Sequence, residues 1–291
     1  MQGVGEMKRV GCITAIITSY VVLYFIGFMG SYFYINSTKT KPVVAVPSQN
    51  YSEIDNELRN LREEEKSYLK KRKAMYPKEV FLTFDDGPSS NNTLAVLNIL
   101  KSNNIKATFF VVGNQVEQHA EIVKQLNDNG MCILAHSYSH DYSIYRSVSS
   151  YFEDLEACNS AIEKATGRKG QLYTRLPGGS DNAVATRAQM QNIRSSLKEK
   201  YVYYVDWNVS SADAACDKVP TERIKENVIN QCSGKKLAVV LMHDSYPKTT
   251  TVEALPAIIK YLKSQGFEFR TFDDITPEEE KAMIKERVVN R

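Results

Sequence analysis

The chain has 291 residues, of which 43% are hydrophobic and 24% charged, so it is long enough for one large globular domain with accessory segments. Its 37 basic and 34 acidic side chains leave a formal net charge of only +3. Because this excess is small and both signs are interspersed along the chain, we expect no nucleic-acid partner.

The first feature along the chain is a run without charged side chains from residue 10 to residue 35. As a helix this run would be about 39 Å long, more than the ~30 Å hydrocarbon core of a bilayer. We therefore expect a single-pass transmembrane helix at 10–35, a cytoplasmic tail at 1–9 and the rest of the chain outside the cell membrane. A cleaved signal peptide is the alternative, although its apolar core is usually shorter.

The segment after this run is polar and then helical in pattern. Residues 36–50 contain Pro42 and Pro47, which is typical of a spacer. Residues 51–75 carry a partial apolar stripe, with acidic side chains ahead of basic ones, which predicts a helix. We interpret 36–77 as a spacer and stalk helix. The helix could be a short dimerising coil or a solvated helix, and its few heptads favour the solvated helix and a monomer.

From residue 78 onward, short β-branched and aromatic runs alternate with helical patterns. Strands are predicted at 80–84, 107–112, 131–135, 172–175, 202–206, 237–242 and 267–271, and helices at 93–101, 120–128, 149–166, 185–199, 221–231 and 251–264. This alternation predicts parallel βα units, and their number in so short a chain favours a barrel over an open sheet. Thr276 and Pro277 predict the start of a last helix, with an exposed remainder over 276–291.

One predicted strand ends in two adjacent carboxylates, Asp85 and Asp86, before a Gly-Pro pair that breaks the backbone. Burying neighbouring carboxylates is costly unless a cation or hydrogen bonds compensate. Polar residues also follow the ends of other predicted strands, namely His136, Arg175, Asp206 and His243. Because barrel enzymes build their sites at the carboxyl ends of the strands, we expect these groups to meet there.

Three of these residues form a candidate metal site. Asp86, His136 and His140 offer one oxygen and two nitrogen donors, and the four-residue spacing of the histidines lets a helical turn or a tight loop aim both at one point. Three protein ligands leave one position of a zinc ion open for water, as in catalytic sites. Cobalt or nickel could occupy the same site. The alternative is that these are ordinary surface or core histidines.

The other polar groups could supply an acid and a base. Asp85 could accept a proton as general base, and His243 could protonate a leaving nitrogen. Arg175 and Asp206 could tune them by ion pairing. The structural alternatives are a turn aspartate, a histidine paired with a neighbouring acid, and two strand-end salt bridges. We expect the fourth histidine, His119, to be an ordinary surface residue.

Five motifs in this order resemble those of a known family. They are TFDDGP (83–88), HSYSH (136–140), RLPGG (175–179), DWN (206–208) and LMHD (241–244). Together they resemble the polysaccharide deacetylase family, which is carbohydrate esterase family 4 and carries the NodB homology domain. The resemblance covers about 78–275 and implies a distorted (β/α) barrel of about seven parallel strands.

The resemblance also implies a role for each matched residue. Residues that resemble the metal triad are Asp86, His136 and His140. Asp85 resembles the catalytic base, which Arg175 would position. His243 resembles the catalytic acid, which Asp206 would tune.

Three further residues resemble the substrate-binding part of the family's site. The main-chain N–H of Gly178 resembles the oxyanion donor, and Trp207 and Leu241 resemble the walls of the pocket for the acetyl methyl group. Trp207 could equally be a core aromatic residue.

The implied reaction is hydrolysis of an N-acetyl group of N-acetylglucosamine in a polymer, releasing acetate. The predicted anchor favours peptidoglycan as that polymer. Chitin oligomers, an N-acetylglucosamine exopolysaccharide and O-acetylated xylan are alternative substrates, and a catalytically silent wall-binding scaffold is the alternative that is not an enzyme.

Five cysteines remain to be placed. Cys12 lies in the predicted span, and the other four would lie outside the cell, where disulfides persist. Cys216 and Cys232 flank a loop-helix segment, and we expect that they could pair.

Overall fold

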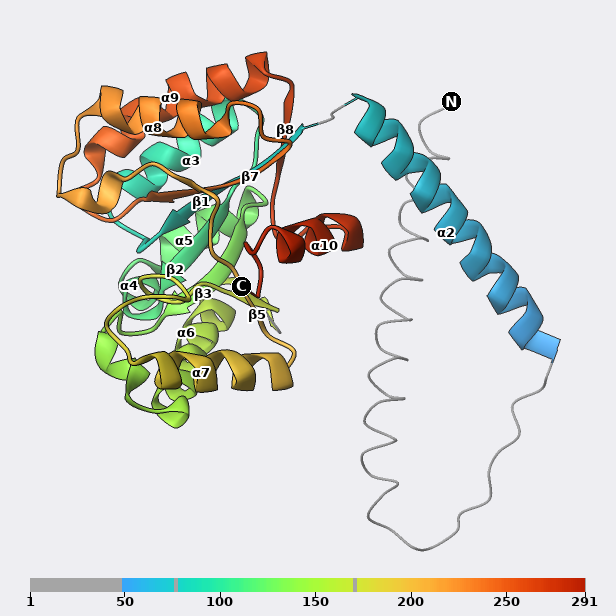
Figure 1. Cartoon of the computed structure of the whole chain (residues 1–291), viewed down its shortest axis with the longest axis horizontal. Helices are drawn as coiled ribbons and strands as arrows, with labels where there is room; N and C mark the ends of the chain where they lie inside the picture. Colours follow the sequence, from blue (N-terminus) through green and yellow to red (C-terminus); the bar gives the residue numbers. More distant parts are fainter. Residues whose placement is uncertain (1–48, 76–77, 170–171, 291) are drawn as a thin grey trace, which may run out of the picture. The chain divides into compact units, whose positions relative to one another are not determined.

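The computed structural model describes residues 49–75, 78–169 and 172–290 (Figure 1). The predicted transmembrane segment at 10–35 therefore lies outside the described residues. No helix among the described residues is long and apolar enough to cross a membrane. Helix α2 (Gln49–Met75) confirms the predicted helix at 51–75, and most of its described side chains are exposed.

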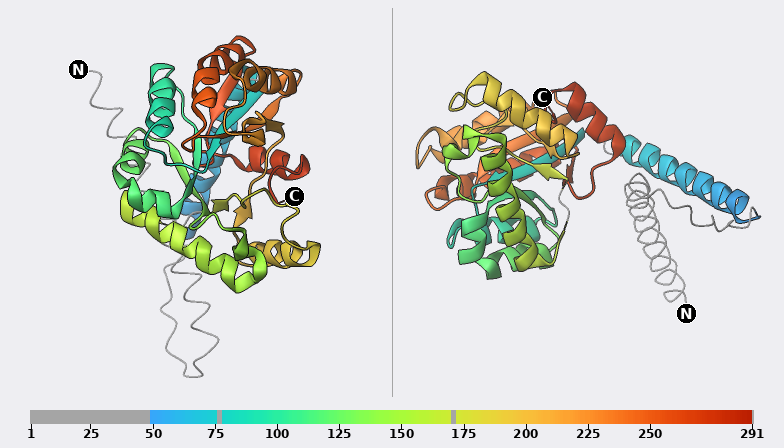
Figure 2. Two further views of the ribbon diagram at one scale, coloured as in Figure 1. Left: turned by 90° about the vertical axis from the view of Figure 1, so that its left-hand side faces the viewer. Right: turned by 90° about the horizontal axis from the view of Figure 1, so that it is seen from below.

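The folded domain is a curled, barrel-like sheet of parallel strands (Figures 1 and 2). The strands pair in the order β5-β4-β3-β2-β1-β7-β6, and β8 pairs with the beginning of β1. Their bounds are β1 Lys78–Asp85, β2 Thr108–Val112, β3 Cys132–Ser137, β4 Tyr173–Thr174, β5 Tyr203–Tyr204, β6 Val209–Ser210, β7 Leu237–His243 and β8 Phe267–Arg270. The seven predicted strands are confirmed, two of them in shortened form, while β6 was not predicted.

The two ends of this strand order belong to one continuous stretch of chain. β5 pairs with β4 and β6 pairs with β7, and only residues 205–208 separate β5 from β6. The stretch 203–210 therefore passes from one edge of the sheet to the other, which gives the sheet its barrel-like form. Asp206 and Trp207 lie within this crossing segment.

The helices surround the sheet in two groups (Figures 1 and 2). Helices α3, α8 and α9 pack together, as do α4, α5, α6 and α7. Their bounds are α3 Asn92–Ser102, α4 Gly113–Gln118, α5 Ala120–Asp128, α6 Val148–Thr166, α7 Arg187–Glu199, α8 Thr221–Cys232 and α9 Thr249–Ser264, with 3₁₀ turns η1 Tyr142–Arg146 and η2 Asp213–Ala215. All six helices predicted between the strands are confirmed, and α4 was not predicted.

Both faces of the central strands are buried, which explains why they read as continuous apolar runs rather than alternating ones. Successive side chains of β1 point to opposite faces. Leu82 and Phe84 belong to the larger hydrophobic cluster, which they share with the surrounding helices. Phe81 belongs to a second cluster together with Phe110 of β2 and Val239 of β7.

The end of the chain packs against the domain. Helix α10 (Pro277–Lys285) begins as predicted, with a capping box between Thr276 and Glu279 and a proline in its first turn. The prediction of an exposed remainder is wrong for Val288 and Val289, which are buried in the second cluster. The main-chain N–H of Asp206 donates to the carbonyl of Val288 at 2.7 Å, so the last residues line the crossing segment.

The predicted pairing of Cys216 with Cys232 is wrong. All four cysteines of the described residues are free thiols, and Cys232 is buried in α8 while Cys216 is exposed.

Candidate active site

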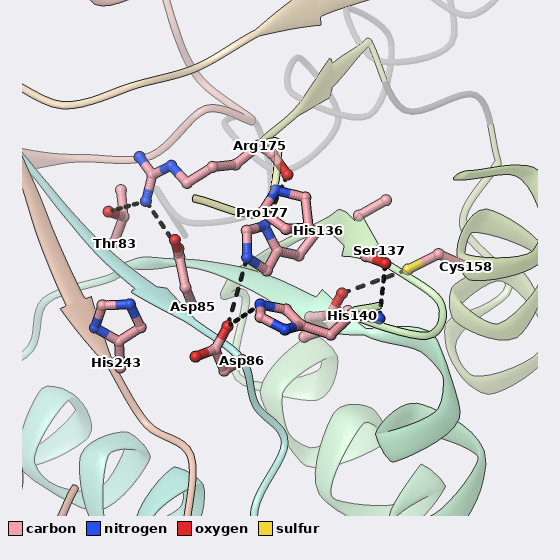
Figure 3. A network of polar contacts seen from close by, with 12 residues as sticks. Thr83, Asp85, Asp86, His136, Ser137, His140, Cys158, Arg175, Pro177 and His243 are labelled. Carbon is pink, nitrogen blue, oxygen red and sulfur yellow. Dashed lines mark hydrogen bonds and ion pairs between the residues drawn. The ribbon is translucent and has the colours of Figure 1, made fainter. Parts of the chain in front are cut away.

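The carboxyl ends of neighbouring strands bring the predicted residues together (Figure 3). β1 and β7 pair in register from Glu79 with Leu237 to Asp85 with His243. His136 lies near the end of β3, and Arg175 directly follows β4. The strands β4, β3, β2, β1 and β7 are consecutive neighbours in the sheet. The residues at their carboxyl ends therefore lie along one edge of it.

The metal triad predicted from the sequence is assembled. Nε2 of His140 lies 3.1 Å and Nε2 of His136 lies 3.4 Å from Oδ1 of Asp86. One ligand atom from each residue lies within 4.8 Å of the other two. Asp86 Oδ1 is buried and has no hydrogen-bond partner among the described residues. A buried, unpaired carboxylate oxygen facing two imidazole nitrogens fits a divalent cation.

The tautomer of His136 and the charge of Asp86 also suit a cation. Nδ1 of His136 lies 2.7 Å from the carbonyl oxygen of Arg175. A carbonyl oxygen can only accept, so Nδ1 carries the proton and Nε2 presents its lone pair to the site. Burial would raise the pKa of Asp86, but the nearby His136 and His140 imidazoles and the charge of His243 outweigh burial and hold this pKa well below its usual value. The carboxylate is therefore ionised.

The backbone around Asp86 shows how the motif delivers two acids in different directions. Asp86 has a φ of 72°, in the left-handed region, which turns its side chain away from that of Asp85. The next residue must be glycine, because a Cβ on Gly87 would lie 2.5 Å from the carboxylate oxygens of Asp244. The glycine in this motif is thus required by close packing against Asp244, which follows the end of β7.

The predicted base is held by the predicted arginine. Asp85 is 3% exposed, and Nη1 of Arg175 donates to its Oδ1 at 2.8 Å. The same nitrogen donates to Oγ1 of Thr83 at 2.7 Å, and the guanidinium lies 4.2 Å from the centre of the Phe110 ring. Oδ2 of Asp85 accepts no hydrogen bond from the described residues, so it is the oxygen left to take a proton.

The predicted acid, His243, has a different partner from the one expected. Asp213, in η2, lies with Oδ1 2.7 Å from Nδ1 of His243. Burial would lower the pKa of His243, but the hydrogen bond and charge of Asp213 outweigh it and raise the pKa to about 9. The assignment of Asp206 to this role is wrong. Asp213 follows shortly after β6, and we did not predict that strand. An acid just after a strand end was the signal that could have identified it.

Asp206 instead holds the loop that carries the predicted oxyanion donor. Its Oδ1 accepts from the N–H of Ser180 at 2.9 Å, and its Oδ2 accepts from Oγ of Ser180 at 2.5 Å. Gly178 has a φ of 75°, and its N–H donates to no acceptor among the described residues. The Gly178 amide is therefore available to a ligand.

The two predicted pocket walls lie in different surroundings. Trp207 packs against the second hydrophobic cluster, and a Cβ on Gly179 would lie 3.0 Å from its ring. Trp207 therefore supports the glycine loop as well as the core. Leu241 lies between Val239 and His243 on the same face of β7 and belongs to neither cluster of the described residues.

A groove of about 370 Å³ opens from the triad. Asp86 and His140 lie in its wall, together with Asn114, His119 and Tyr246. The prediction that His119 is an ordinary surface residue is wrong, because the short α4 turns it into this groove. A larger cavity of about 590 Å³ lies beside α7 and the chain terminus and contains none of the predicted site residues, so the groove is the candidate site.

Comparison with known proteins agrees with this geometry. The family described as polysaccharide deacetylase matches residues 72–194. A peptidoglycan-N-acetylglucosamine deacetylase of Bacillus cereus is 30% identical over 259 residues, which cover 87% of this chain and 91% of that protein. The chain belongs to the polysaccharide deacetylase family. As a polysaccharide deacetylase it is a hydrolase.

Two further members of the family are similar. The peptidoglycan-N-acetylglucosamine deacetylase PgdA of Listeria monocytogenes is 32% identical over 203 residues, 70% of this chain and 40% of that protein. The solved catalytic domain of a peptidoglycan N-acetylglucosamine deacetylase from Eubacterium rectale superimposes with a TM-score of 0.64 at 35% identity, covering 69% of this chain and 90% of that domain. The polysaccharide deacetylase fold predicted from the motifs is thus confirmed.

Proposed function

We propose that this polysaccharide deacetylase hydrolyses the N-acetyl groups of N-acetylglucosamine residues in peptidoglycan, with a divalent metal ion held by Asp86, His136 and His140. The observation that carries the proposal is the convergence of a base, an acid and a complete ligand set at one edge of the sheet. The substrate is supported by the relatives, whose names specify peptidoglycan N-acetylglucosamine.

The ligand set is suited to zinc, and cobalt or nickel suits the same donors. When bound, such an ion polarises the acetamide carbonyl and lowers the pKa of water. His136 is held for this purpose by its bond to the Arg175 carbonyl, which also connects the ligand set to the residue that positions the base.

The residues of the chain can carry out each proton transfer. Oδ2 of Asp85 accepts a proton from the attacking water, while Arg175 keeps Oδ1 paired and the carboxylate oriented. The free N–H of Gly178 donates to the oxygen that becomes negatively charged as the new C–O bond forms. The glycine loop is held in place for this role by the two bonds from Ser180 to Asp206.

Collapse of the tetrahedral species breaks the C–N bond. His243 is protonated at neutral pH, since its pKa is raised to about 9, and it can donate this proton to the departing nitrogen. The products are acetate and a glucosamine residue. Leu241 lies on the same face of β7 two residues before His243, and it would contact the acetyl methyl group.

The groove suits a polymer. It continues from the triad to Tyr246, and the ring of Tyr246 is 72% exposed. We propose that the glycan chain lies along it, and that residues 10–35 anchor the protein in the cell membrane with the catalytic domain outside. An anchored domain would meet peptidoglycan close to the membrane.

The test is acetate release from peptidoglycan, N-acetylglucosamine oligomers and acetylated xylan, each with metal-stripped and zinc-restored protein. We expect zinc-dependent release that is fastest from peptidoglycan and absent in Asp85→Asn. Faster release from the free oligomers or from xylan would replace the substrate in this proposal. No release from any of them by zinc-loaded protein would favour the silent scaffold.

A further inference from the structure

The loop that carries the second histidine of the triad has an unfavourable backbone. It runs from Ser137, the last residue of β3, to His140, ahead of η1, and His140 has a φ of 54°. A histidine in the left-handed region costs free energy relative to an extended or helical backbone. Since Nε2 of His140 must nevertheless lie 3.1 Å from Asp86, something outside the loop has to hold it.

A single carboxylate from a helix holds this loop. Asp154 lies in the second turn of α6, and its Oδ2 accepts from Oγ of Ser137 at 2.6 Å and from the N–H of Tyr138 at 2.7 Å. Its Oδ1 accepts from the N–H of Ser139 at 2.9 Å. Three consecutive residues of the metal-binding loop thus donate to one side chain.

The same network reaches His140 itself. Oγ of Ser137, which donates its proton to Asp154, accepts from the N–H of His140 at 2.9 Å (Figure 3). Because the proton of Ser137 is given to the carboxylate, the lone pairs of its oxygen are free for the His140 N–H. The position of the histidine therefore depends on Asp154 through the Ser137 hydroxyl.

The helix that bears Asp154 is well anchored. Ser147 caps its first turn by accepting from the N–H of Ser150, and Tyr151, Leu155 and Cys158 are buried in the larger cluster. The three donors, from Ser137, Tyr138 and Ser139, all point to one side chain, which must therefore offer only acceptor atoms. A carboxylate provides two oxygens that both accept. An asparagine of the same size would offer one acceptor oxygen and would place an N–H₂ group against a donor.

We propose that Asp154 is a positioning residue of the metal site, acting on His140 through the loop at 137–139. The proposal rests on the proposed function, because it takes Asp86, His136 and His140 as metal ligands. Partners that orient metal ligands typically change metal affinity by about 10- to 100-fold when they are removed. Asp154 does not contact the ligand ring, so its effect is on geometry.

The test is the zinc affinity of full-length Asp154→Asn, measured by competition with a chromophoric chelator. We expect the zinc dissociation constant to rise by roughly 10- to 100-fold. We also expect the visible absorption of the cobalt-substituted protein to change in position or intensity, because the loop no longer holds the His140 ligand in its position. The thermal midpoint of the metal-free protein should stay close to that of the wild type.

The matched control is Glu156→Gln. This residue lies on the same helix and its side chain is exposed, so the substitution removes the same charge without touching the loop. A control with wild-type zinc affinity, beside a weakened Asp154→Asn, would support the specific contacts over a general effect of charge.

Two results would overturn the proposal. The first is an Asp154→Asn protein that is folded, binds zinc as tightly as the wild type and keeps its cobalt spectrum. The second result applies if Asp154→Asn does not fold. In that case Ser137→Ala is the test, because it removes the hydrogen bond to the His140 N–H. Wild-type zinc affinity in Ser137→Ala would contradict the proposal. If the wild-type protein itself binds no zinc, cobalt or nickel, the proposed function fails first, which distinguishes the two failures.

Discussion

Asp213 and His243 form a close pair in which Asp213 is buried and His243 is half-buried. Oδ1 of Asp213 lies 2.7 Å from Nδ1 of His243, and Oδ2 accepts from the main-chain N–H of the same residue at 2.8 Å. Oγ1 of Thr251 donates to Oδ2 as well, at 2.8 Å. Because Asp213 is only 1% exposed, water competes little for these bonds. The carboxylate therefore fixes the orientation of the imidazole and leaves Nε2 as the nitrogen that can give up a proton.

This pair predicts the alkaline limit of activity. The raised pKa means that His243 is protonated below about pH 9 and loses its proton as the pH rises through this value. Asp213→Asn removes the charge that stabilises the imidazolium, so the pKa should fall toward about 6.5. We expect the alkaline limb of kcat to move to lower pH by at least one unit, with a large loss of activity at pH 8. A pH profile of acetate release measures both.

The control for that experiment is Asp206→Asn. Asp206 contacts Ser180 and not His243, so its removal should disturb the glycine loop and slow the reaction without moving the alkaline limb. If the limb moves in Asp206→Asn and stays in place in Asp213→Asn, the assignment of the two acids is reversed.

Metal removal provides the second prediction. Stripping the protein with a chelator should reduce acetate release by roughly a hundredfold or more, since a metal ion contributes several kcal/mol to such a reaction. Circular dichroism should show that the fold persists, because the ligands are held by protein bonds such as that from His136 to Arg175. Zinc, cobalt or nickel should restore the rate. Full activity after verified metal removal would exclude the metal-dependent mechanism.

Asp85→Asn should affect both the rate and the stability. The rate should fall by about 10²- to 10⁴-fold, because a general base contributes about this much. The guanidinium of Arg175 is completely buried and loses its charged partner in this variant. We expect the free energy of unfolding to fall by roughly 1–3 kcal/mol, measured by chemical denaturation.

Thr83→Val distinguishes these two effects. It removes another acceptor of Arg175, the hydroxyl at 2.7 Å, and keeps Asp85. The variant should lose stability while retaining much more activity than Asp85→Asn. Equal losses of activity in both would mean that the arginine network, rather than the Asp85 carboxylate, limits the rate.

The groove predicts a dependence on substrate length. Asn91 and Asn92 each donate a side-chain N–H to the carbonyl of Tyr246, at 3.0 and 3.1 Å, so the exposed ring is presented on an anchored loop. A sugar stacked on it would cover about 40–80 Å² of ring, worth roughly 1–2 kcal/mol or a five- to thirtyfold change in affinity. Tyr246→Ala should raise KM for long oligomers by this factor and change kcat little.

Tyr201→Ala is the matched control, because Tyr201 is also 72% exposed but lines the larger cavity away from the triad. It should leave KM unchanged for every oligomer. If Tyr246→Ala raises KM equally for a disaccharide and a pentasaccharide, the ring does not bind a distant sugar unit.

Much of the site could be predicted from the sequence because its chemistry is local to the strand ends. Asp85 and Asp86 end a continuous apolar run, and the histidines of the HSYSH motif follow another, so their place at one edge follows from the parallel arrangement of strands. The Gly178 N–H was likewise singled out from the RLPGG motif, whereas the positive φ of Asp86 became visible only in the structure.

The tertiary structure decided what depends on residues far apart in the chain. Asp206 and Asp213 both lie near the end of a strand, and only the passage of residues 203–210 across the sheet brings Asp213 to His243 and leaves Asp206 beside Ser180. The position of His119 in the wall of the groove was also decided by the tertiary structure. Helix α4, which precedes it, is too short to be predicted from its sequence pattern. The sequence by itself determined which functional groups stand at the strand ends. Which of them touch was decided by packing, because a hydrogen bond requires a direction and a distance that only the folded backbone sets.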